Sequence, residues 1–210
     1  MPFELPKLYA ITDRRLSGLS HAGQVERLCE GGARLVQLRE KHLSPRELYA
    51  EAAEALAVAR RWGARLLIND RADLALALEA DGVHLGQDDL PPGAARALLG
   101  EVAVVGFSTH NAAQAAEAGR LPVDYVAVGP IFQTSSKEKP NPVVGLEGVR
   151  GARAAVPAHI PLVAIGGITA ESARSVLEAG ADSVAVIGAL LRRGEPDEIA
   201  RLTRSFLARL

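Results

Sequence analysis

Short runs of consecutive apolar residues alternate along this chain with longer amphipathic segments. The segment 45–62 is typical of the latter, with apolar residues at helical spacing: Leu48, Ala52, Ala55, Leu56 and Ala59. Near-continuous apolar runs indicate parallel strands buried on both faces. Eight strands are expected, at 8–11, 35–38, 66–68, 82–85, 102–107, 125–128, 162–165 and 184–187. About eight β/α units in 210 residues predict an α/β fold that closes into a (β/α)8 TIM barrel rather than an open sheet.

Composition favours one domain, so residues 1–210 are expected to form a single barrel. Hydrophobic residues make up 48% of the chain and charged residues 23%, as in a soluble globular protein. A net charge of -1 gives no global attraction to nucleic acid or to an acidic membrane surface. In addition, no stretch approaches the roughly 18 apolar residues of a membrane span. From the charge and this absence together, neither nucleic acid nor a membrane is an expected partner.

The lone cysteine, Cys29, excludes an intrachain disulfide. It lies in an apolar helical pattern with Val25 and Leu28, which predicts a buried structural thiol rather than a nucleophile. The first seven residues lack the basic and apolar regions of a secretory signal, and a cytoplasmic location is expected. The sequence leaves open whether the protein is a homo-oligomer.

Polar and charged residues follow three of the expected strands at the point where each strand ends. The sequences are Arg39-Glu40-Lys41, Asn69-Asp70-Arg71 and Gly86-Gln87-Asp88-Asp89. In a barrel these strand ends converge on one mouth, so the three segments are expected to form one site. For any one segment, a strand that ends in an ordinary polar loop is the alternative.

The pooled residues are suited to a metal-bound diphosphate. Asp70 and Asp89 are expected to hold Mg²⁺, which bridges phosphate oxygens. Arg39, Lys41 and Lys137 are expected to donate charge-assisted hydrogen bonds to the same oxygens, and Asn69 adds an amide. Lys137 lies in the long irregular segment 129–145. Such a site stabilises charge that grows on a leaving group.

Glycines after the last two strands indicate a second anion pocket. Gly166-Gly167 follows the seventh strand and Ile187-Gly188 ends the eighth, where barrels commonly bind phosphate with backbone N–H groups. Glycines at a tight turn need no ligand, so both interpretations stay open for Gly166-Gly167 alone. Of the two expected anion pockets, only the first contains metal-binding acids. This difference favours a reaction in which pyrophosphate leaves one substrate while a second substrate, held by its monophosphate, attacks.

Other polar residues have structural alternatives. Asp81, Asp124 and Asp182 precede strands and are expected to accept backbone hydrogen bonds at the opposite end of the barrel. Of the five histidines, His21, His42 and His159 are expected in solvent, whereas His84 and His110 face the mouth. For His84, a hydrogen-bonded interior imidazole and direct ligand contact both remain open.

The chain resembles the thiamine-phosphate synthase family over essentially its whole length. The resemblance rests on segments 37–41, 69–73, 82–89, 106–110 and 129–132 with 134–137. It implies a Mg²⁺-dependent transferase that condenses 4-amino-2-methyl-5-hydroxymethylpyrimidine diphosphate with 4-methyl-5-(2-hydroxyethyl)thiazole phosphate. The products are thiamine phosphate and pyrophosphate.

The resemblance also implies residue roles. It assigns the diphosphate to Arg39, Lys41, Asn69 and Lys137, and Mg²⁺ to Asp70 and Asp89. It places the pyrimidine and its leaving oxygen at Gln37 and Ser108, with His84 nearby. It assigns the thiazole phosphate to Thr134 and Ser136 with backbone groups of Gly167, Ile187 and Gly188. Arg39, Lys41, Ser108 and Lys137 are the implied catalytic residues. Family chemistry suggests that diphosphate leaves first, giving a pyrimidine-stabilised carbocation that the thiazole nitrogen captures. Two departures are Gly188, where relatives carry Ser, and Thr-Ser-Ser-Lys at 134–137, where Thr-x-Thr-Lys is common.

Two other functions are weighed. The thiazole tautomerase branch of the same superfamily resembles this chain at Gly129 and Phe132, at 145–148 and at 186–188, and would use His110 for metal-free proton transfer. Asp70 and Asp89 argue against it, because an isomerase has no diphosphate to neutralise. A barrel that binds thiamine-like phosphates as a sensor predicts tight product binding without turnover.

Overall fold

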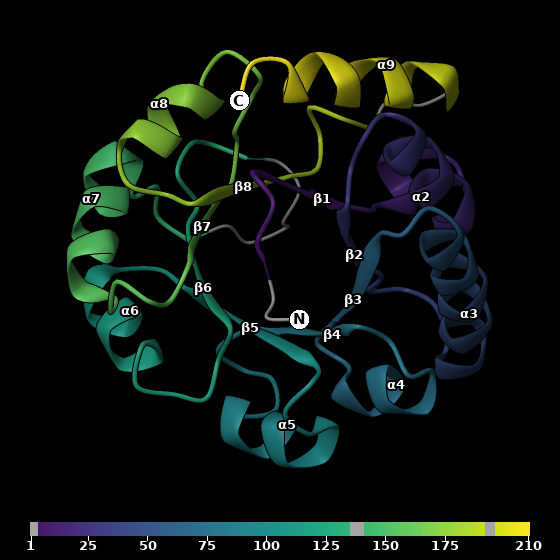
Figure 1. Ribbon diagram of the computed structural model, residues 1–210, viewed down its shortest axis with the longest axis horizontal. Helices are drawn as coiled ribbons and strands as arrows, with labels where there is room; N and C mark the ends of the chain where they lie inside the picture. Colours follow the sequence, from purple (N-terminus) through teal and green to yellow (C-terminus); the bar gives the residue numbers. More distant parts are fainter. Residues whose placement is uncertain (1–3, 135–140, 192–195) are drawn as a thin grey trace.

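Eight parallel strands close into a barrel in the order in which they occur along the chain. The computed structural model describes residues 4–134, 141–191 and 196–210. The strands are β1 (Leu8–Ile11), β2 (Leu35–Leu38), β3 (Arg65–Asn69), β4 (Gly82–Leu85), β5 (Val104–Thr109), β6 (Tyr125–Val128), β7 (Leu162–Ile165) and β8 (Ser183–Val186). Pairing of β1 with β8 completes the ring (Figure 1), so the predicted (β/α)8 TIM barrel is confirmed.

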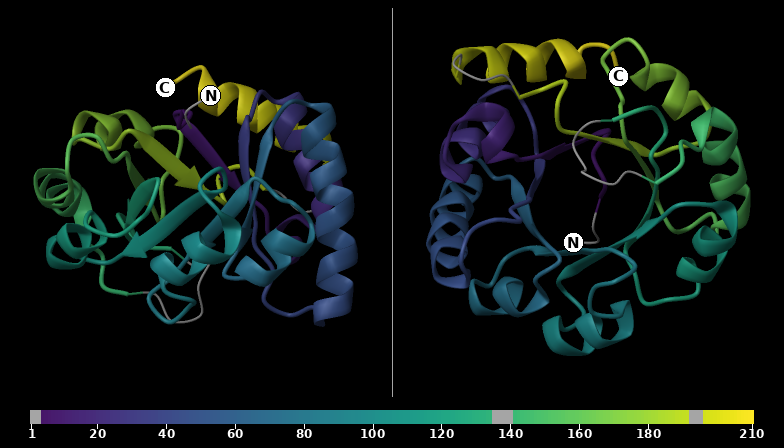
Figure 2. Two further views of the ribbon diagram at one scale, coloured as in Figure 1. Left: turned by 60° about the horizontal axis from the view of Figure 1, so that its bottom comes forward. Right: turned by 180° about the vertical axis from the view of Figure 1, so that it is seen from behind.

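Helices form a ring outside the strands, as all three ribbon views show (Figures 1 and 2). They are α1 (Arg14–Ser17), α2 (His21–Glu30), α3 (Pro45–Arg61), α4 (Ala72–Ala77), α5 (Pro92–Leu99), α6 (Ala112–Ala118), α7 (Gly145–Ala155), α8 (Ala173–Glu178) and α9 (Pro196–Leu207). Helix α3 begins with a capping box, in which Ser44 accepts from the Glu47 backbone N–H and the Glu47 carboxylate accepts from the Ser44 N–H. Helix α9 packs against α2.

Two apolar layers follow from the alternation of side chains along each strand. Outward residues such as Leu8, Ala10 and Val36 pack under the helices. The inward residues form a second cluster within the ring: Tyr9, Ile11, Leu35, Leu67, Val104, Tyr125, Ala127, Val163 and Ala185. The barrel therefore has a filled interior, and polar groups meet solvent only towards its ends.

Most strand positions agree with the expected ones, and the largest difference is at β5. The apolar Val102 was expected to begin this strand, but its side chain is 95% exposed in the loop before it. The strand continues instead through Ser108 to Thr109. Hydrophobicity placed the start of the strand too early, at the apolar Val102. It also placed the end too early, because the polar residues Ser108 and Thr109 pair with β6.

The aspartates before β4, β6 and β8 are structural, as predicted. Each carboxylate accepts a backbone N–H from the preceding strand: Asp81 from Leu66 at 2.8 Å, Asp124 from Val105 at 2.7 Å and Asp182 from Leu162 at 2.8 Å. These bonds tie neighbouring strands together at the end of the barrel remote from the polar strand ends.

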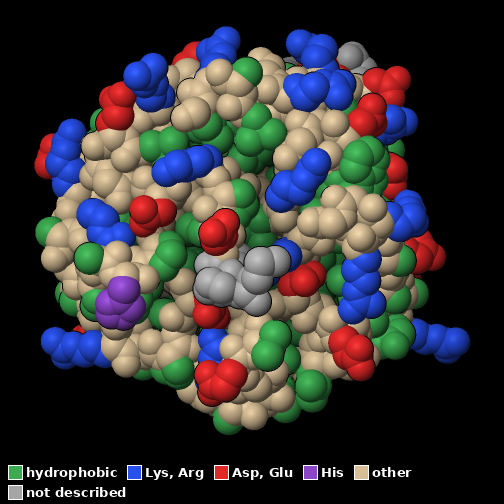
Figure 3. Space-filling view, viewed as in Figure 1, with side chains coloured by type: hydrophobic (Ala, Val, Ile, Leu, Met, Phe, Trp, Pro, Cys, Tyr) green, Lys and Arg blue, Asp and Glu red, His purple; other side chains and the backbone are tan. Residues whose placement is uncertain are grey.

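Charge is mixed over the face that Figure 3 presents, where Lys and Arg side chains alternate with Asp and Glu side chains. Cys29 is buried in the outer core, as predicted. Within the described ranges, no helix has the length and apolar character needed to cross a membrane.

Candidate active site

Four polar side chains enter the barrel interior from adjacent strands. Gln37, Asn69, His84 and Ser108 lie on β2, β3, β4 and β5. The register pairs Asn69 with His84 and His84 with Gly106, two residues before Ser108. Because alternate residues of a strand share a face, this register directs all four towards the mouth.

A chain of hydrogen bonds connects three of these side chains, Gln37, His84 and Ser108, across the interior. The Gln37 side-chain amide donates to the Tyr9 hydroxyl at 2.9 Å, and the Tyr125 hydroxyl donates to the same oxygen at 3.0 Å. His84 Nδ1 lies 2.8 Å from the Tyr125 hydroxyl, and its Nε2 lies 2.8 Å from Ser108 Oγ. The pyrimidine-side candidates Gln37 and Ser108 are therefore positioned by one continuous network.

The direction of these bonds assigns the proton on His84. Burial raises the pKa of Tyr9 and that of Tyr125, so both phenols stay protonated. Since Tyr125 donates to Tyr9, its oxygen accepts from His84 Nδ1–H, and His84 Nε2 is left to accept from Ser108. His84 also stacks on the Tyr125 ring, with centroids 5.6 Å apart. It is thus a hydrogen-bonded interior imidazole that orients Ser108.

The two candidate metal ligands lie beside each other and beside a cation. Lys41 Nζ pairs with Asp70, whose backbone adopts a left-handed φ of 63°. Asp89 accepts the Gly86 backbone N–H at 2.7 Å. Burial and then the neighbouring Asp70 carboxylate raise the pKa of Asp89, against the effect of the Gly86 bond. A second cation near this carboxylate pair would relieve its repulsion.

The residues present fit Mg²⁺ that arrives with a diphosphate. In the described part of the chain, no group of three or more His, Cys, Asp or Glu residues could enclose a metal ion. Mg²⁺ is commonly held by one or two carboxylates, with substrate phosphates and water as the remaining ligands. Asp70 and Asp89 match that donor set.

Arg39 and Asn69 supply further groups for an anion. Arg39 lies 3.5 Å from the Asp13 carboxylate and its side chain is 17% exposed. The Asn69 side-chain nitrogen is buried and has no hydrogen-bond partner among the described residues. An unpartnered buried donor is costly, and an incoming phosphate oxygen would satisfy it.

A cavity of about 590 Å³ adjoins this polar cluster on the side of β6, β7 and β8. Its lining includes the predicted phosphate-site residues Thr134, Gly167, Ile187 and Gly188, together with Ser108. Ser108 therefore belongs both to the His84 network and to the cavity wall. This shared residue joins the two predicted anion sites at one mouth.

The backbone requires glycine at some positions of the cavity wall and not at others. Gly166 and Gly167 have φ values of 106° and 67°, and a Cβ on Gly167 would lie 2.4 Å from the Gln133 carbonyl oxygen. The backbone conformation of this turn therefore requires glycine whether or not a ligand binds, and the turn also lines the cavity. A Cβ on Gly188 would meet nothing within 4 Å.

His110 also lines the cavity, and both of its ring nitrogens have partners. Nδ1 lies 2.8 Å from the Gly129 carbonyl oxygen, to which it donates. Nε2 then accepts from the Asn141 amide at 3.1 Å. The imidazole therefore has a role in fixing the cavity wall.

Sequence reasoning missed several residues of the site. Tyr9 and Tyr125 looked like apolar strand residues, although their inward positions were a signal that the phenols need partners. Asp13 and Arg209 were not singled out; Arg209 is the one Lys or Arg among the described residues that line the cavity, and it pairs with Glu171 at 2.9 Å. Ser136 and Lys137 lie outside the described residues.

A closed parallel barrel with a carboxylate–cation cluster and a glycine-lined cavity at one mouth defines the class of barrel enzymes that act on phosphorylated substrates. Comparison with known proteins narrows the class. The sequence model described as "Thiamine monophosphate synthase" matches residues 8–190. The chain belongs to that family.

Curated relatives agree over nearly the whole length. The chain is 45% identical over 203 residues to the thiamine-phosphate synthase of Chloroflexus aurantiacus, covering 96% of this chain and 93% of the relative. It is 50% identical over 195 residues to that of Koribacter versatilis, with 90% of each covered. A solved thiamine phosphate pyrophosphorylase from Pyrococcus furiosus superposes with a TM-score of 0.84 at 36% identity, over 97% of this chain and 94% of that one.

Proposed function

We propose that this protein condenses 4-amino-2-methyl-5-hydroxymethylpyrimidine diphosphate with 4-methyl-5-(2-hydroxyethyl)thiazole phosphate to give thiamine phosphate and pyrophosphate. The observation that carries the proposal is Ser108, which joins the polar cluster to the glycine-lined cavity. Each site suits one of the two phosphorylated substrates. The reacting carbon and nitrogen would meet beside Ser108.

On the pyrimidine side, the carbon–oxygen bond breaks and the electron pair leaves with pyrophosphate. Arg39, Lys41 and Asn69 would donate hydrogen bonds to the departing oxygens, and Lys137 is assigned to the same group by the family motif. Mg²⁺, held by Asp70 and Asp89, would neutralise part of the growing charge when bound. Gln37 and Ser108 would orient the pyrimidine.

On the thiazole side, the ring nitrogen donates its electron pair to form the new carbon–nitrogen bond. Backbone N–H groups of Gly167, Ile187 and Gly188 would hold the phosphate, with hydroxyls of Thr134 and Ser136. Arg209 also lines this cavity, where it is paired with Glu171. With both substrates bound, the cavity walls would shield the reacting carbon from water, which would otherwise compete as the nucleophile.

We propose further that residues 1–210 form one domain and that the protein acts in the cytoplasm. Neither nucleic acid nor a membrane is part of the proposed activity. A homo-oligomer is compatible with it.

The direct experiment measures thiamine phosphate and pyrophosphate from the two purified substrates, with Mg²⁺ and then with EDTA. Both products in equal amounts, lost on chelation and restored by added Mg²⁺, are expected. Folded protein that forms neither product would overturn the proposal. Thiazole phosphate tautomerisation abolished in His110→Ala would then favour the tautomerase, and tight thiamine phosphate binding without turnover would favour the sensor.

A further inference from the structure

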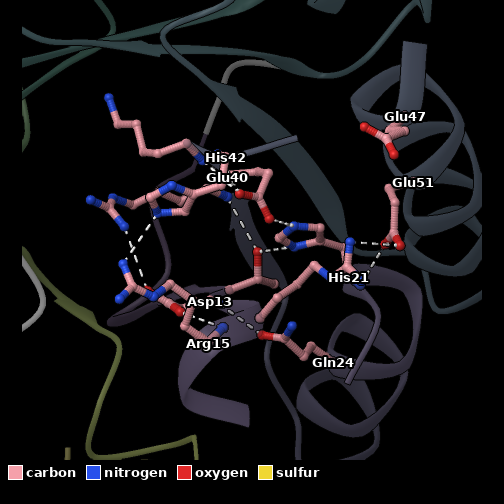
Figure 4. A network of polar contacts seen from close by, with 12 residues as sticks. Asp13, Arg15, His21, Gln24, Glu40, His42, Glu47 and Glu51 are labelled. Carbon is pink, nitrogen blue, oxygen red and sulfur yellow. Dashed lines mark hydrogen bonds and ion pairs between the residues drawn. The ribbon is translucent and has the colours of Figure 1, made fainter. Parts of the chain in front are cut away.

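His21 is fully buried, although its position at the start of a helix predicted solvent exposure. Its ring contacts Thr12, which follows β1, and Glu40, which lies between Arg39 and Lys41 after β2. Figure 4 shows the ring next to Glu40. A buried imidazole needs partners for both nitrogens. The two partners connect it to both ends of the segment 39–41.

On one side, His21 reaches the carboxylate of Glu40. Nε2 of His21 lies 3.4 Å from Glu40 Oε2. The other carboxylate oxygen accepts the backbone N–H groups of Lys41 and His42, each at 2.8 Å. Burial opposes ionisation of Glu40, but the N–H donors of His42 and Lys41 and the His21 ring outweigh it and lower the pKa of Glu40. An ionised Glu40 therefore holds the backbone at Lys41.

On the other side, His21 reaches Thr12. Nδ1 of His21 lies 2.8 Å from Thr12 Oγ1, and that oxygen accepts the Arg39 backbone N–H at 3.2 Å. The hydroxyl proton has a second acceptor, the Gln37 carbonyl oxygen, at the longer distance of 3.2 Å. The shorter distance assigns the Thr12 proton to His21.

The protonation of His21 agrees with this assignment. Burial, only partly offset by Glu40, lowers the pKa of His21, so the ring is neutral near pH 7. Its single proton then lies on Nε2, facing the Glu40 carboxylate, and Nδ1 accepts from Thr12. The bonds run without conflict from the Arg39 N–H through Thr12, His21 and Glu40 to the Lys41 N–H.

Neighbouring groups hold His21 in place. Its backbone N–H donates to Glu51 Oε2 at 3.0 Å, and Glu51 pairs with Arg14 at 3.2 Å. Figure 4 shows the ring between Glu40 on one side and Glu51 on the other. Helices α2 and α3 thus both anchor the imidazole.

We propose that Thr12, His21 and Glu40 are positioning residues, a clamp that fixes the backbone of residues 39–41 and so aims the Arg39 and Lys41 side chains at the substrate diphosphate. The inference rests on the proposed function for the nature of the anion. The clamp residues themselves touch no substrate. Loosening the clamp should weaken diphosphate binding selectively, because the thiazole cavity is built by other strands.

The test compares two isosteric changes. Thr12→Val removes the hydroxyl inside the clamp, and Thr203→Val removes one outside it. Both threonines are fully buried, and the Thr203 hydroxyl donates within α9, to the Ile199 carbonyl oxygen. Thr12→Ser keeps the hydroxyl. Glu40→Ala releases the other end of the clamp. For each variant, KM is measured for both substrates, and the Kd of inorganic pyrophosphate with Mg²⁺ is measured by calorimetry.

For Thr12→Val and Glu40→Ala, we expect about a tenfold rise in the pyrimidine diphosphate KM and in the pyrophosphate Kd, with the thiazole phosphate KM within about twofold of the parent. Thr12→Ser and Thr203→Val should retain parent values. Equal changes in both KM values, or a Thr203→Val effect matching Thr12→Val, would overturn the clamp. Unaltered pyrophosphate binding in folded Thr12→Val and Glu40→Ala would also overturn it. If the parent protein binds pyrophosphate but makes no thiamine phosphate, the proposed function is contradicted. The clamp is then tested by the pyrophosphate Kd values of the parent and the variants alone.

Discussion

Single glycines at the mouth of the barrel have opposite packing environments. A Cβ on Gly106 would lie 2.0 Å from the ring carbon that bears the Tyr125 hydroxyl, whereas a Cβ on Gly188 would enter open space. The first position is closed by a neighbour, and the second is free for a new side chain. The two substitutions should therefore have opposite consequences.

Gly106→Ala should impair both activity and stability. The added methyl group must displace Tyr125, which orients His84 and through it Ser108. We expect turnover to fall at least tenfold and the free energy of unfolding to fall by about 2 kcal/mol. Steady-state rates and urea denaturation measure the two effects. Gly93→Ala is the control, because nothing lies near that Cβ; a comparable loss there would contradict the explanation.

Gly188→Ser should strengthen binding of thiazole phosphate. The serine has room, its backbone φ is not in the left-handed region, and the hydroxyl adds a donor beside the proposed phosphate position. A fall in the thiazole phosphate KM of roughly fivefold corresponds to one ordinary hydrogen bond. Gly188→Ala separates the hydroxyl from the Cβ. A higher KM in the serine variant alone would place the phosphate elsewhere.

At the scale of elements, three pairs of neighbouring strands, β3 with β4, β5 with β6 and β7 with β8, are each joined at the amino-terminal end by an aspartate from the loop. Asp124 accepts from the Val105 N–H and also pairs with Arg96 at 2.6 Å, and that guanidinium donates to two carbonyl oxygens of residues 100 and 103. Helix α5, β5 and β6 are thereby joined by one largely buried ion pair. The active mouth lies at the other end of these strands.

Asp124→Ala should therefore destabilise the fold without changing substrate recognition. It leaves the Val105 N–H unsatisfied and the Arg96 charge unpaired, and we expect a loss of about 2–3 kcal/mol in the free energy of unfolding. Both KM values should stay within a factor of about two. Glu178→Ala breaks the exposed Arg174 ion pair and should cost no more than about 0.5 kcal/mol. Denaturant titrations that give both variants the same loss would rule out a special role for Asp124.

At the scale of the whole molecule, one apolar layer lies inside the closed ring and a second lies between the ring and the helices, where Cys29 is buried. Its side chain is 1% exposed, between α2 and the barrel. Burial raises the pKa of the Cys29 thiol to about 11. A raised thiol pKa means that the neutral form persists in the folded protein at pH values where an unfolded chain already carries thiolate.

Native protein should react very slowly with thiol reagents at pH 8. At that pH, roughly one folded molecule in a thousand carries the thiolate, compared with about a quarter of unfolded molecules. Labelling should accelerate with urea in parallel with unfolding measured by circular dichroism. Rapid labelling without denaturant would show that the outer layer opens locally near α2.

The fold could be predicted from particular sequence patterns, and the site only in part. The expected bounds of β1, β2, β4, β6 and β7 agree with the structure, because buried parallel strands are short and apolar throughout. Hydrophobicity misplaced β5, where polar residues at the mouth also pair. His21 was wrongly expected in solvent, because its partners Thr12 and Glu40 lie 9 and 19 residues away along the chain.

The sequence by itself determined the closed barrel and the types of residue at its mouth, since both follow from local periodicity and from where strands end. Only the tertiary structure decided which groups meet. The inward register links Gln37 to Ser108 through two tyrosines, and the approach of α2 to the ends of β1 and β2 closes the hydrogen bonds around Arg39 and Lys41. Periodicity tells which face of a strand a residue occupies, but hydrogen bonds between distant residues depend on distances that exist only once the ring has closed.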